Sequence, residues 1–446
     1  MRRCPPGTPA AACLVVVACS GTLERPLHPA VTDSAITEVR DDTARSVTET
    51  TTATPSCPRL VAPADAPRVT PDLDGAALAA AVAAAPEGST VVFAPGVYDL
   101  GGVPLRLDTP GVTLVSESGY PDDVLIDGGY RVETVLTITA SDVHVGGLLF
   151  AHSTGTLIDV VPAGASITGL ELVSLGLTDP GGVAMRFGTD GADHWVDGAE
   201  LGCSRFELTS AGRSDVSRRS GGTCATGGLD VYGADAPWVH DVNVSGFWCA
   251  NGTSGPAIHL RGGTRGALIE RSFVLDGAQG VLIGEAETGS GRAAPEGACG
   301  EGAGALGVYG SVVRNLGVTL TDPNLESAEA GFVVGVGVEH ACAVVLAHNT
   351  VYVAQPARRG DFVVGAGAEA TLLNNLGTVP IVVDPAGVAV EAGNLVGTAD
   401  WLTTDLHLRS DAPAVDAGQP LSAGTCADDR DGDLRDALPD VGADER

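Results

Sequence analysis

The feature that most restricts the fold is the shortness of the apolar runs. In GALIERSFVLDGAQGVLIG, residues 266–284, these runs hold two or three residues each, and Asp-Gly-Ala-Gln-Gly separates the last two. Similar segments recur from residue 89 onward, for example STVVFAPGVYDL, GVTLVSESG and VHVGGLLFAHS. They predict strands of about four to six residues that end at Gly, Asp, Ser or Pro. Because neighbouring strands leave no room for a crossover helix, parallel βαβ units are excluded.

The spacing of the asparagines predicts how these strands stack. The pairs Arg314-Asn315, His348-Asn349 and Asn374-Asn375 each follow two or more apolar residues, and their second members are spaced 34 and 26 residues apart. Coils of roughly 20 to 35 residues are typical of a solenoid. Asparagine tolerates the left-handed conformation of a bend, and stacked amides can bond from coil to coil. We therefore expect an all-β right-handed parallel β-helix with these three asparagines at equivalent bends.

Two segments carry a resemblance to a known family. LAAAVAAAPEGSTVVFAPGVY, residues 78–98, resembles the helix and first coil that cap many right-handed parallel β-helix repeat proteins of bacterial surfaces. SDAPAVDAG with DRDGDLRDALPDVGADE, residues 410–418 and 429–445, is similar to a terminal segment common on secreted β-helices. The resemblance implies a short N-terminal capping helix. In that family some members are polysaccharide lyases or glycoside hydrolases and many have no assigned activity, so the fold does not define the function.

The N-terminus predicts export. Arg2 and Arg3 precede an apolar run over residues 10–18 that is too short to span a bilayer, as in a secretory signal peptide. The run ends in Val-Val-Ala-Cys, which resembles the bacterial lipobox and would make Cys19 the lipidated residue. The alternative is ordinary cleavage near Ala18.

These patterns divide the chain into four parts. We expect a signal peptide over residues 1–18, a solvated tether over 19–70, the β-helix over 71–400 and a C-terminal capping segment over 401–446.

Composition excludes several function classes. All 25 basic residues are arginine, so chemistry that requires a lysine is excluded. The net charge of −31 disfavours nucleic acid as a partner, and also polyanionic sugars unless a divalent cation intervenes. No CxxC occurs, and the acidic run after Ala427 does not fit an EF-hand frame. We expect no metal site and no cofactor.

Strand alternation points to one candidate ligand-binding site. In MRFG, LDVYG and AIHLRG the flanking apolar residues face the core, so the polar residues between them point outward. If these strands stack in register, Arg186, Asp230 and His259 form one outward column, and Tyr232 and Arg261 lie in the next. An arginine, a carboxylate and an imidazole side by side could bind or protonate a sugar. The alternative is a solvated charge ladder with no ligand.

The cysteines predict disulfides, since export brings the chain into an oxidising compartment. Cys203 and Cys224 bracket a polar insert and are the first expected pair. Cys249 with Cys299 is the second, although sequence alone does not define the pairing.

The function expected from these observations is carbohydrate binding, or a structural or adhesive role, at the cell surface. The chain would be anchored to the membrane through lipid only, or else secreted, and its partner would be extracellular polysaccharide. The alternative is a polysaccharide lyase or glycoside hydrolase. A lyase needs a base such as Arg261 and usually calcium, and a hydrolase needs two carboxylates about 5 to 9.5 Å apart. Neither constellation is evident in the sequence.

Overall fold

The computed structural model describes residues 57, 59–219, 224–249, 252–285, 291–295, 299, 307–320, 334–353, 360–422 and 425–446. Cys19, the signal peptide expected over residues 1–18 and most of the tether expected over 19–70 lie outside the described residues.

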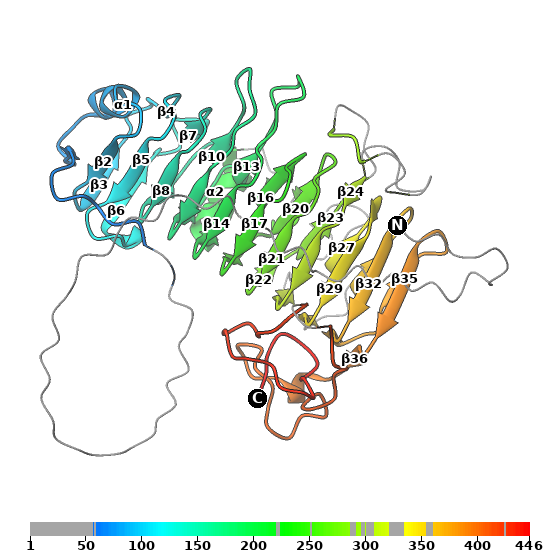
Figure 1. Ribbon diagram of the computed structural model, residues 1–446. Coiled ribbons are helices and arrows are strands. Elements are labelled where there is room, and N and C mark those ends of the chain that lie inside the picture. The colour runs from blue at the N-terminus through cyan, green and yellow to red at the C-terminus, as the bar shows by residue number, and fades with distance from the viewer. Residues whose placement is uncertain are drawn as a thin grey trace, which may run out of the picture.

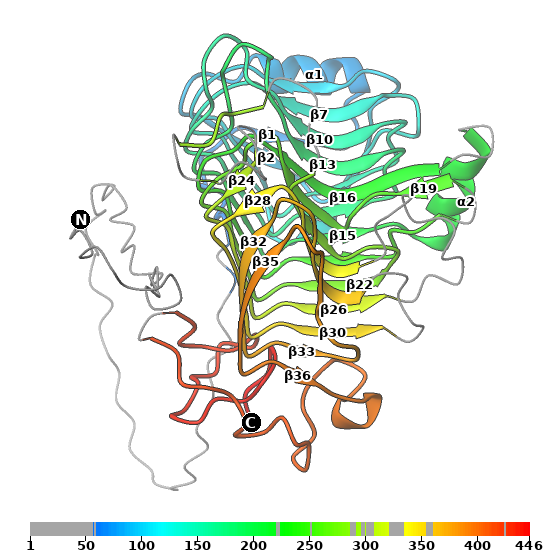
Figure 2. The ribbon, with the colours of Figure 1, turned by 90° about the vertical axis from the view of Figure 1, so that its right-hand side faces the viewer.

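The described chain is a right-handed parallel β-helix, as expected (Figures 1 and 2). Each coil contributes one short strand to each of three parallel sheets, as in β8 (His144–Gly146), β9 (Leu149–Ala151) and β10 (Thr156–Val160). Only two residues separate β8 from β9, whereas ten separate β10 from the next strand, β11 (Glu171–Val173). The first and second strands of a coil are mostly joined by such short turns, and the longer loops leave the coils after the second or the third strand.

Every strand pairs with the equivalent strand of the next coil, which gives three long sheets. Sheet A contains β1 (Arg68–Val69), β2 (Thr90–Phe93), β5 (Thr113–Ser116), β8, β11, β14 (Glu200–Gly202), β17 (Trp238–His240), β21 (Leu268–Glu270), β25 (Val312–Arg314), β29 (Val344–Ala347), β32 (Glu369–Leu373) and β35 (Val388–Ala392). Sheet B contains β3 (Gly96–Asp99), β6 (Val124–Asp127), β9, β12 (Gly176–Thr178), β15 (Arg205–Glu207), β18 (Asn243–Ser245), β22 (Phe273–Gly277), β26 (Gly317–Leu320), β30 (Thr350–Val353), β33 (Leu376–Gly377) and β36 (Leu395–Val396).

Sheet C carries the candidate site. It contains β4 (Leu105–Leu107), β7 (Thr134–Ile138), β10, β13 (Val183–Phe187), β16 (Cys224–Tyr232), β20 (Ile258–Arg261), β23 (Val281–Ile283), β27 (Val334–Val338), β31 (Gly360–Val364) and β34 (Val382–Val383). Beside it, β19 (Gly252–Ser254) pairs with the first residues of β16, and β24 (Val308–Tyr309) pairs with β28 (Ala341–Cys342).

The core is a stack of apolar layers. One inward position of sheet A is apolar and fully buried in nine successive coils, namely Leu114, Val145, Leu172, Leu201, Val239, Ile269, Val313, Leu346 and Leu372. In the next coil the same position is Glu391, which is exposed. A charge at the inward position of the last strand opposes the addition of another coil or another chain.

The opposite end of the core is closed by α1 (Gly75–Ala83), which lies across the first coil (Figure 2). Asp74 caps the helix through a hydrogen bond from the Ala77 amide, and Leu78 and Val82 are buried against the core. A Cβ at Gly75 would lie 1.9 Å from the Leu100 carbonyl oxygen, so only glycine allows this approach. The capping helix expected from the sequence is therefore present.

The turn from sheet A to sheet B repeats its backbone conformation along the helix. One residue with positive φ occupies it in nine successive coils: Gly147, Ser174, Cys203, Asp241, Arg271, Asn315, His348, Asn374 and Gly393. The next residue points inward. In the last three coils it is Asn349, Asn375 and Asn394, which we call the asparagine column.

Every amide of the asparagine column bonds to the neighbouring coils. Asn349 Nδ2 donates to Asn375 Oδ1 at 2.9 Å, and Asn375 Nδ2 donates to Asn394 Oδ1 at 3.0 Å. Each Oδ1 also accepts the backbone N–H of the preceding coil, and each Nδ2 also donates to a backbone carbonyl there. The prediction of a ladder is confirmed for Asn349 and Asn375 and is wrong for Asn315. Asn315 lies one position earlier, in the positive-φ turn, because Leu316 takes the inward place.

Residues 401–446 fold along the side of the last coils, below sheet B in the view of Figure 1. Their backbone carbonyls accept hydrogen bonds from the turn residues: Asp428 from Asn315, Asp440 from His348, and Gln419 from Asn374. A second, small apolar cluster joins this segment to β33 through Leu376, Leu402, Leu406, Leu408, Ala412, Ala414 and Val441.

Both expected disulfide pairings are wrong. Cys203 is bonded to Cys57, and Cys299 is bonded to Cys342. Cys203 lies in the sheet A to sheet B turn, whereas Cys224 begins β16 in sheet C, so residues close in sequence lie on different sides of the coil. Cys249 is also disulfide-bonded, and the Cys224 side chain lies outside the described part of the chain.

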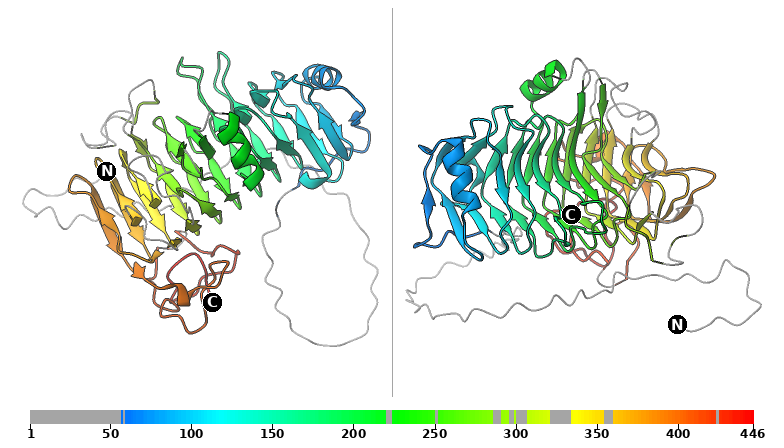
Figure 3. Two further views of the ribbon diagram at one scale, coloured as in Figure 1. Left: turned by 180° about the vertical axis from the view of Figure 1, so that it is seen from behind. Right: turned by 90° about the horizontal axis from the view of Figure 1, so that it is seen from above.

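The second helix, α2 (Ser210–Arg219), stands outside the coils after β15 (Figure 3). Arg213 fastens it by donating to the carbonyl oxygens of Leu208 and Gly246. The short helices η1 (Pro121–Asp123) and η2 (Ala399–Trp401) complete the described elements.

Candidate ligand-binding site

The predicted register of the outward column is confirmed. Arg186 of β13 pairs with Asp230 of β16, and Asp230 pairs with His259 of β20. Tyr232 pairs with Arg261 in the same way. One coil earlier, Asp159 of β10 pairs with Arg186. We call Asp159, Arg186, Asp230 and His259 the charged column.

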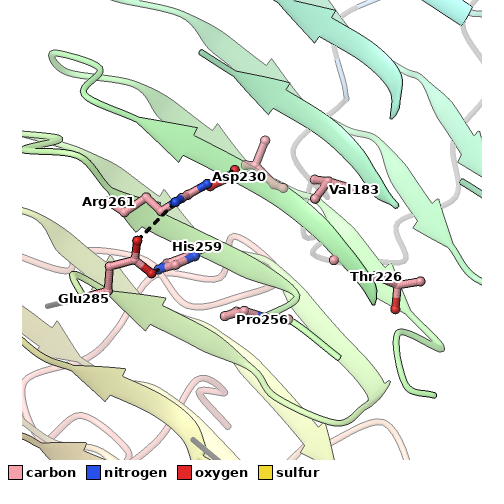
Figure 4. A pocket seen from close by; sticks show the side chains of 10 residues that line it. Val183, Thr226, Asp230, Pro256, His259, Arg261 and Glu285 are labelled. Carbon is pink, nitrogen blue, oxygen red and sulfur yellow. Dashed lines mark hydrogen bonds and ion pairs between the residues drawn. The ribbon is translucent and has the colours of Figure 1, made fainter. Parts of the chain in front are cut away.

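A pocket of about 200 Å³ opens beside the charged column, on the outer face of sheet C (Figure 4). Its lining contains four ionisable side chains that converge on it, those of Asp230, His259, Arg261 and Glu285, together with Val183, Thr226, Gly227, Leu229, Gly255 and Pro256. The pocket lies where β16 extends past its neighbours to pair with β19, so one wall is mainly backbone. A Cβ at Gly227 would lie 3.3 Å from the Pro256 carbonyl oxygen, so glycine leaves this wall open.

Arg261 is the centre of the polar group. Its Nε and Nη2 donate to the two oxygens of Asp230 at 2.7 and 2.8 Å, and its Nη1 donates to Glu285 Oε1 at 3.1 Å. These hydrogen bonds, chiefly those to Asp230, hold the pKa of the guanidinium above its usual value. Arg261 is therefore a fixed cation between two carboxylates, as Figure 4 shows, and not a base.

His259 is the group without a full set of partners. Its Nε2 is buried and makes no hydrogen bond, with Glu285 Oε2 at 3.7 Å. Burial of the ring lowers its pKa, against the opposing effect of the Asp230 and Glu285 carboxylates. Burial therefore favours the neutral form of the imidazole. A buried polar atom with no partner costs free energy, which a ligand donor or acceptor can recover.

Arg186 and Tyr232, the other two candidate ligand-binding residues, do not line the pocket. Arg186 turns toward the preceding coil, where its Nε and Nη2 donate to Asp159 at 2.9 and 2.6 Å. The Tyr232 ring centre lies 5.2 Å from the guanidinium carbon of Arg261, and the ring also stacks on Trp195. The expectation that Arg186 lies within the footprint of a bound ligand stays a prediction, and in the structure its guanidinium pairs with Asp159.

Sequence reasoning missed Asp159 and Glu285. Both signals were present: Asp159 lies in LIDV, in the register of Arg186, and Glu285 directly follows the run VLIG. Asp159 could have been found by extending the strand alignment one coil back. Glu285 lies in the turn beyond β23, where alternation no longer predicts the side-chain direction.

Two groups of potential metal ligands lie elsewhere in the described residues. One is Cys203 with His240 and Asp241, but the disulfide to Cys57 removes the thiolate that a metal would need. The other is His407 with Asp431 and Asp444, where Arg430 Nη2 lies 3.0 Å from His407 Nε2. A permanent cation at this distance disfavours a metal ion.

Within the described residues, no helix has both the length and the apolar character needed to cross a membrane.

No protein-family model and no curated protein matches the chain in sequence. Solved structures similar to it include an alginate lyase from Paenibacillus sp., with 14% identity over 73% of this chain and 98% of the lyase and a TM-score of 0.44. A pectate lyase has 12% identity over 85% of this chain and 97% of its own, with a TM-score of 0.48. A pectin methylesterase from Aspergillus niger has 11% identity over 76% and 88%, with a TM-score of 0.32. At these values no residue role, substrate or activity is transferred. The three parallel sheets and their coil-to-coil register make this chain a right-handed parallel β-helix protein.

Proposed function

We propose that the protein binds an extracellular polysaccharide and that one sugar unit of it enters the pocket beside Asp230, His259, Arg261 and Glu285. The observation that carries the proposal is the buried His259 Nε2, which lacks a hydrogen-bond partner in a pocket lined by two carboxylates and a guanidinium. Sugar-binding pockets need a few convergent polar groups held by a rigid scaffold. The volume of about 200 Å³ suits a single ring rather than an oligosaccharide.

The charge of the pocket argues against a uronate as the bound unit. Asp230 and Glu285 outnumber the single cation, and Arg261 already bonds to both carboxylates. A ligand carboxylate would have to displace one of them. The net charge of −31 opposes a polyanionic chain in the same way.

Glycoside hydrolysis is the second candidate, and a specific observation favours it. Two carboxylates and a neutral imidazole face one pocket, and such groups are the usual acids and bases of sugar chemistry. A lyase that uses Arg261 as its base is disfavoured, because its raised pKa keeps that guanidinium protonated.

A polysaccharide panel tests the proposal and ranks the two candidates. The purified protein is incubated with neutral, cationic and anionic polysaccharides, and both retention and the release of reducing or unsaturated ends are measured. Retention without product supports binding, and product release would reverse the ranking. If the Asp230→Ala, His259→Ala double variant keeps its fold and retains the polysaccharide unchanged, the pocket is not the site.

Two disulfides indicate that the chain folds in an oxidising compartment outside the cytosol. We propose in addition that Cys19 carries a lipid that anchors the protein to a membrane. Metabolic labelling with a radioactive fatty acid tests this. The label should be present on the wild type and absent from a Cys19→Ser variant, and an unlabelled wild type would contradict the anchor.

A further inference from the structure

We infer that the pocket selects a sugar that carries a protonated primary amine, that is, a hexosamine unit without its N-acetyl group. The inference rests on the proposed function, because it names the sugar class that the same pocket takes. It follows from the charge of the pocket, from its available hydrogen-bond acceptors and from the spacing of the carboxylates and the imidazole among its described residues.

The charge of the pocket is the first argument. Asp230 and Glu285 each contribute one negative charge, Arg261 contributes one positive charge, and burial lowers the pKa of His259, which favours its neutral form. The neighbouring Asp159 and Arg186 neutralise each other through two hydrogen bonds. One negative charge therefore remains without a counter-ion inside the pocket. A bound cation would supply it, whereas a neutral sugar would not.

The hydrogen-bonding groups are the second argument. The strong donor of the lining is Arg261, and three of its nitrogens already donate to carboxylates. Among the ionisable groups of the lining, the atoms that can still bond to a ligand are acceptors. They are His259 Nε2 and the oxygens of Asp230 and Glu285, which keep lone pairs beyond those that accept from Arg261. An ammonium group has three N–H donors and no acceptor, so it matches this set better than a hydroxyl, which has a single donor.

The third argument separates an ammonium from a metal ion. The described groups of His, Cys, Asp and Glu that could share a metal do not include Asp230, His259 and Glu285. Arg261 also lies between the two carboxylates and keeps them from closing on a small ion (Figure 4). An ammonium group does not require the two carboxylates to approach each other, because each of its N–H groups can donate to a different acceptor.

The test uses two matched sets of methyl glycosides. One set is glucosamine, N-acetylglucosamine and glucose, and the other is galactosamine, N-acetylgalactosamine and galactose. Within each set only the group at carbon 2 changes. Affinities are measured by calorimetry at a pH of about 6.5, below the usual pKa of such an amine. In at least one set we expect the amine to bind about tenfold more tightly than the hydroxyl and acetamido forms, with an advantage that falls as salt rises.

Two variants assign the preference to the pocket. Glu285→Gln removes one negative charge from the pocket with little change in shape and should abolish most of the amine preference. Glu369→Gln removes the same charge from the exposed outer face of β32 and should leave the preference unchanged. A preference that survives Glu285→Gln would belong to the overall charge of the protein and would overturn the inference.

The outcomes distinguish the inference from the proposed function. Equal binding within each set, or no binding by either amine, overturns the inference. The proposed function then still stands if any polysaccharide of the panel is retained through the pocket. If no polysaccharide is retained, the proposed function fails and the inference fails with it.

Discussion

The asparagine column and the charged column are both stacks of polar side chains at one position of successive coils, yet they differ in how completely they are bonded. In the asparagine column every side-chain donor and acceptor meets a partner in a neighbouring coil. In the charged column the Asp159–Arg186 pair is equally complete, but His259 Nε2 is left without a hydrogen-bond partner beside a pocket. A fully satisfied polar stack stabilises the fold, whereas a partly satisfied one leaves a place for a ligand.

The largest expected effect on stability concerns the Cys57–Cys203 disulfide, which lies at the sheet A to sheet B turn of one coil. Replacing Cys57 and Cys203 by serine should lower the free energy of unfolding by about 5 kcal/mol, because the bond closes a loop of 146 residues. Denaturant unfolding measures it. The Cys299, Cys342 pair, with a separation of 43, is the control and should cost about 4 kcal/mol. Polysaccharide binding should survive in both variants, and loss of binding with an intact fold would contradict the separation of fold and site.

Breaking the asparagine column should lower the free energy of unfolding by almost as much. Asn375→Leu leaves the backbone N–H of Asn349 and the carbonyl of Leu346 without partners in a fully buried turn. We expect a loss of about 3 to 4 kcal/mol, since each buried unsatisfied group costs about 1 to 3 kcal/mol. Asn243→Leu, on the exposed face of β18, is the matched control and should change stability by less than about 0.5 kcal/mol. An equal loss of stability in the two variants would show that the hydrogen bonds of the asparagine column do not stabilise the fold.

A third prediction concerns how stability depends on pH at His348, which lies in the sheet A to sheet B turn beside the asparagine column. Burial lowers the pKa of His348 to about 3. Its Nε2 accepts from Asn374 Nδ2, and its Nδ1 donates to the Asp440 carbonyl, so a second proton has no acceptor. Below pH 6.5 the histidine is protonated in the unfolded chain but stays neutral in the folded chain. The stability that the neutral, buried His348 contributes is therefore lost progressively as the pH falls from 6.5 to about 3.

Replacement by asparagine, the residue found in the coils on either side, should remove this acid sensitivity. Between pH 7 and pH 4 the wild type should lose on the order of 3 kcal/mol more stability than His348→Asn. Burial raises the pKa of Asp440 to about 6, which acts in the opposite direction, since the folded chain then binds the extra proton. Asp440 is present in both proteins, so it cancels in the comparison. Parallel pH profiles of the two proteins would contradict the assigned role of His348.

The sequence predicts the fold and much of the register because both depend on alternation that is local to each strand. Apolar neighbours of Arg186, Asp230 and His259 define which side faces the core, and one outward residue per strand then aligns from coil to coil. The same logic fails in turns. Asn315 and Asn349 differ by one position because spacing alone does not tell a turn residue from the inward residue after it.

Contacts between distant parts of the chain were beyond sequence reasoning. Cys57 reaches Cys203 because the segment before β1 runs beside later coils, where Arg59 donates to the Tyr120 hydroxyl at 2.6 Å. Glu285 reaches Arg261 from a turn one coil away. Neither contact follows from a periodic pattern in the sequence, so only the three-dimensional structure shows which residues complete the site.

The most direct measurement compares two equivalent carboxylates of the charged column. Asp230→Asn and Asp159→Asn each weaken a bidentate pair with an arginine, but only Asp230 lines the pocket. With the polysaccharide that the protein retains most strongly, titration calorimetry should show an affinity reduced about tenfold or more by Asp230→Asn and changed less than about twofold by Asp159→Asn. Equal affinities for the two folded variants would contradict the account and would reduce the charged column to a structural ladder.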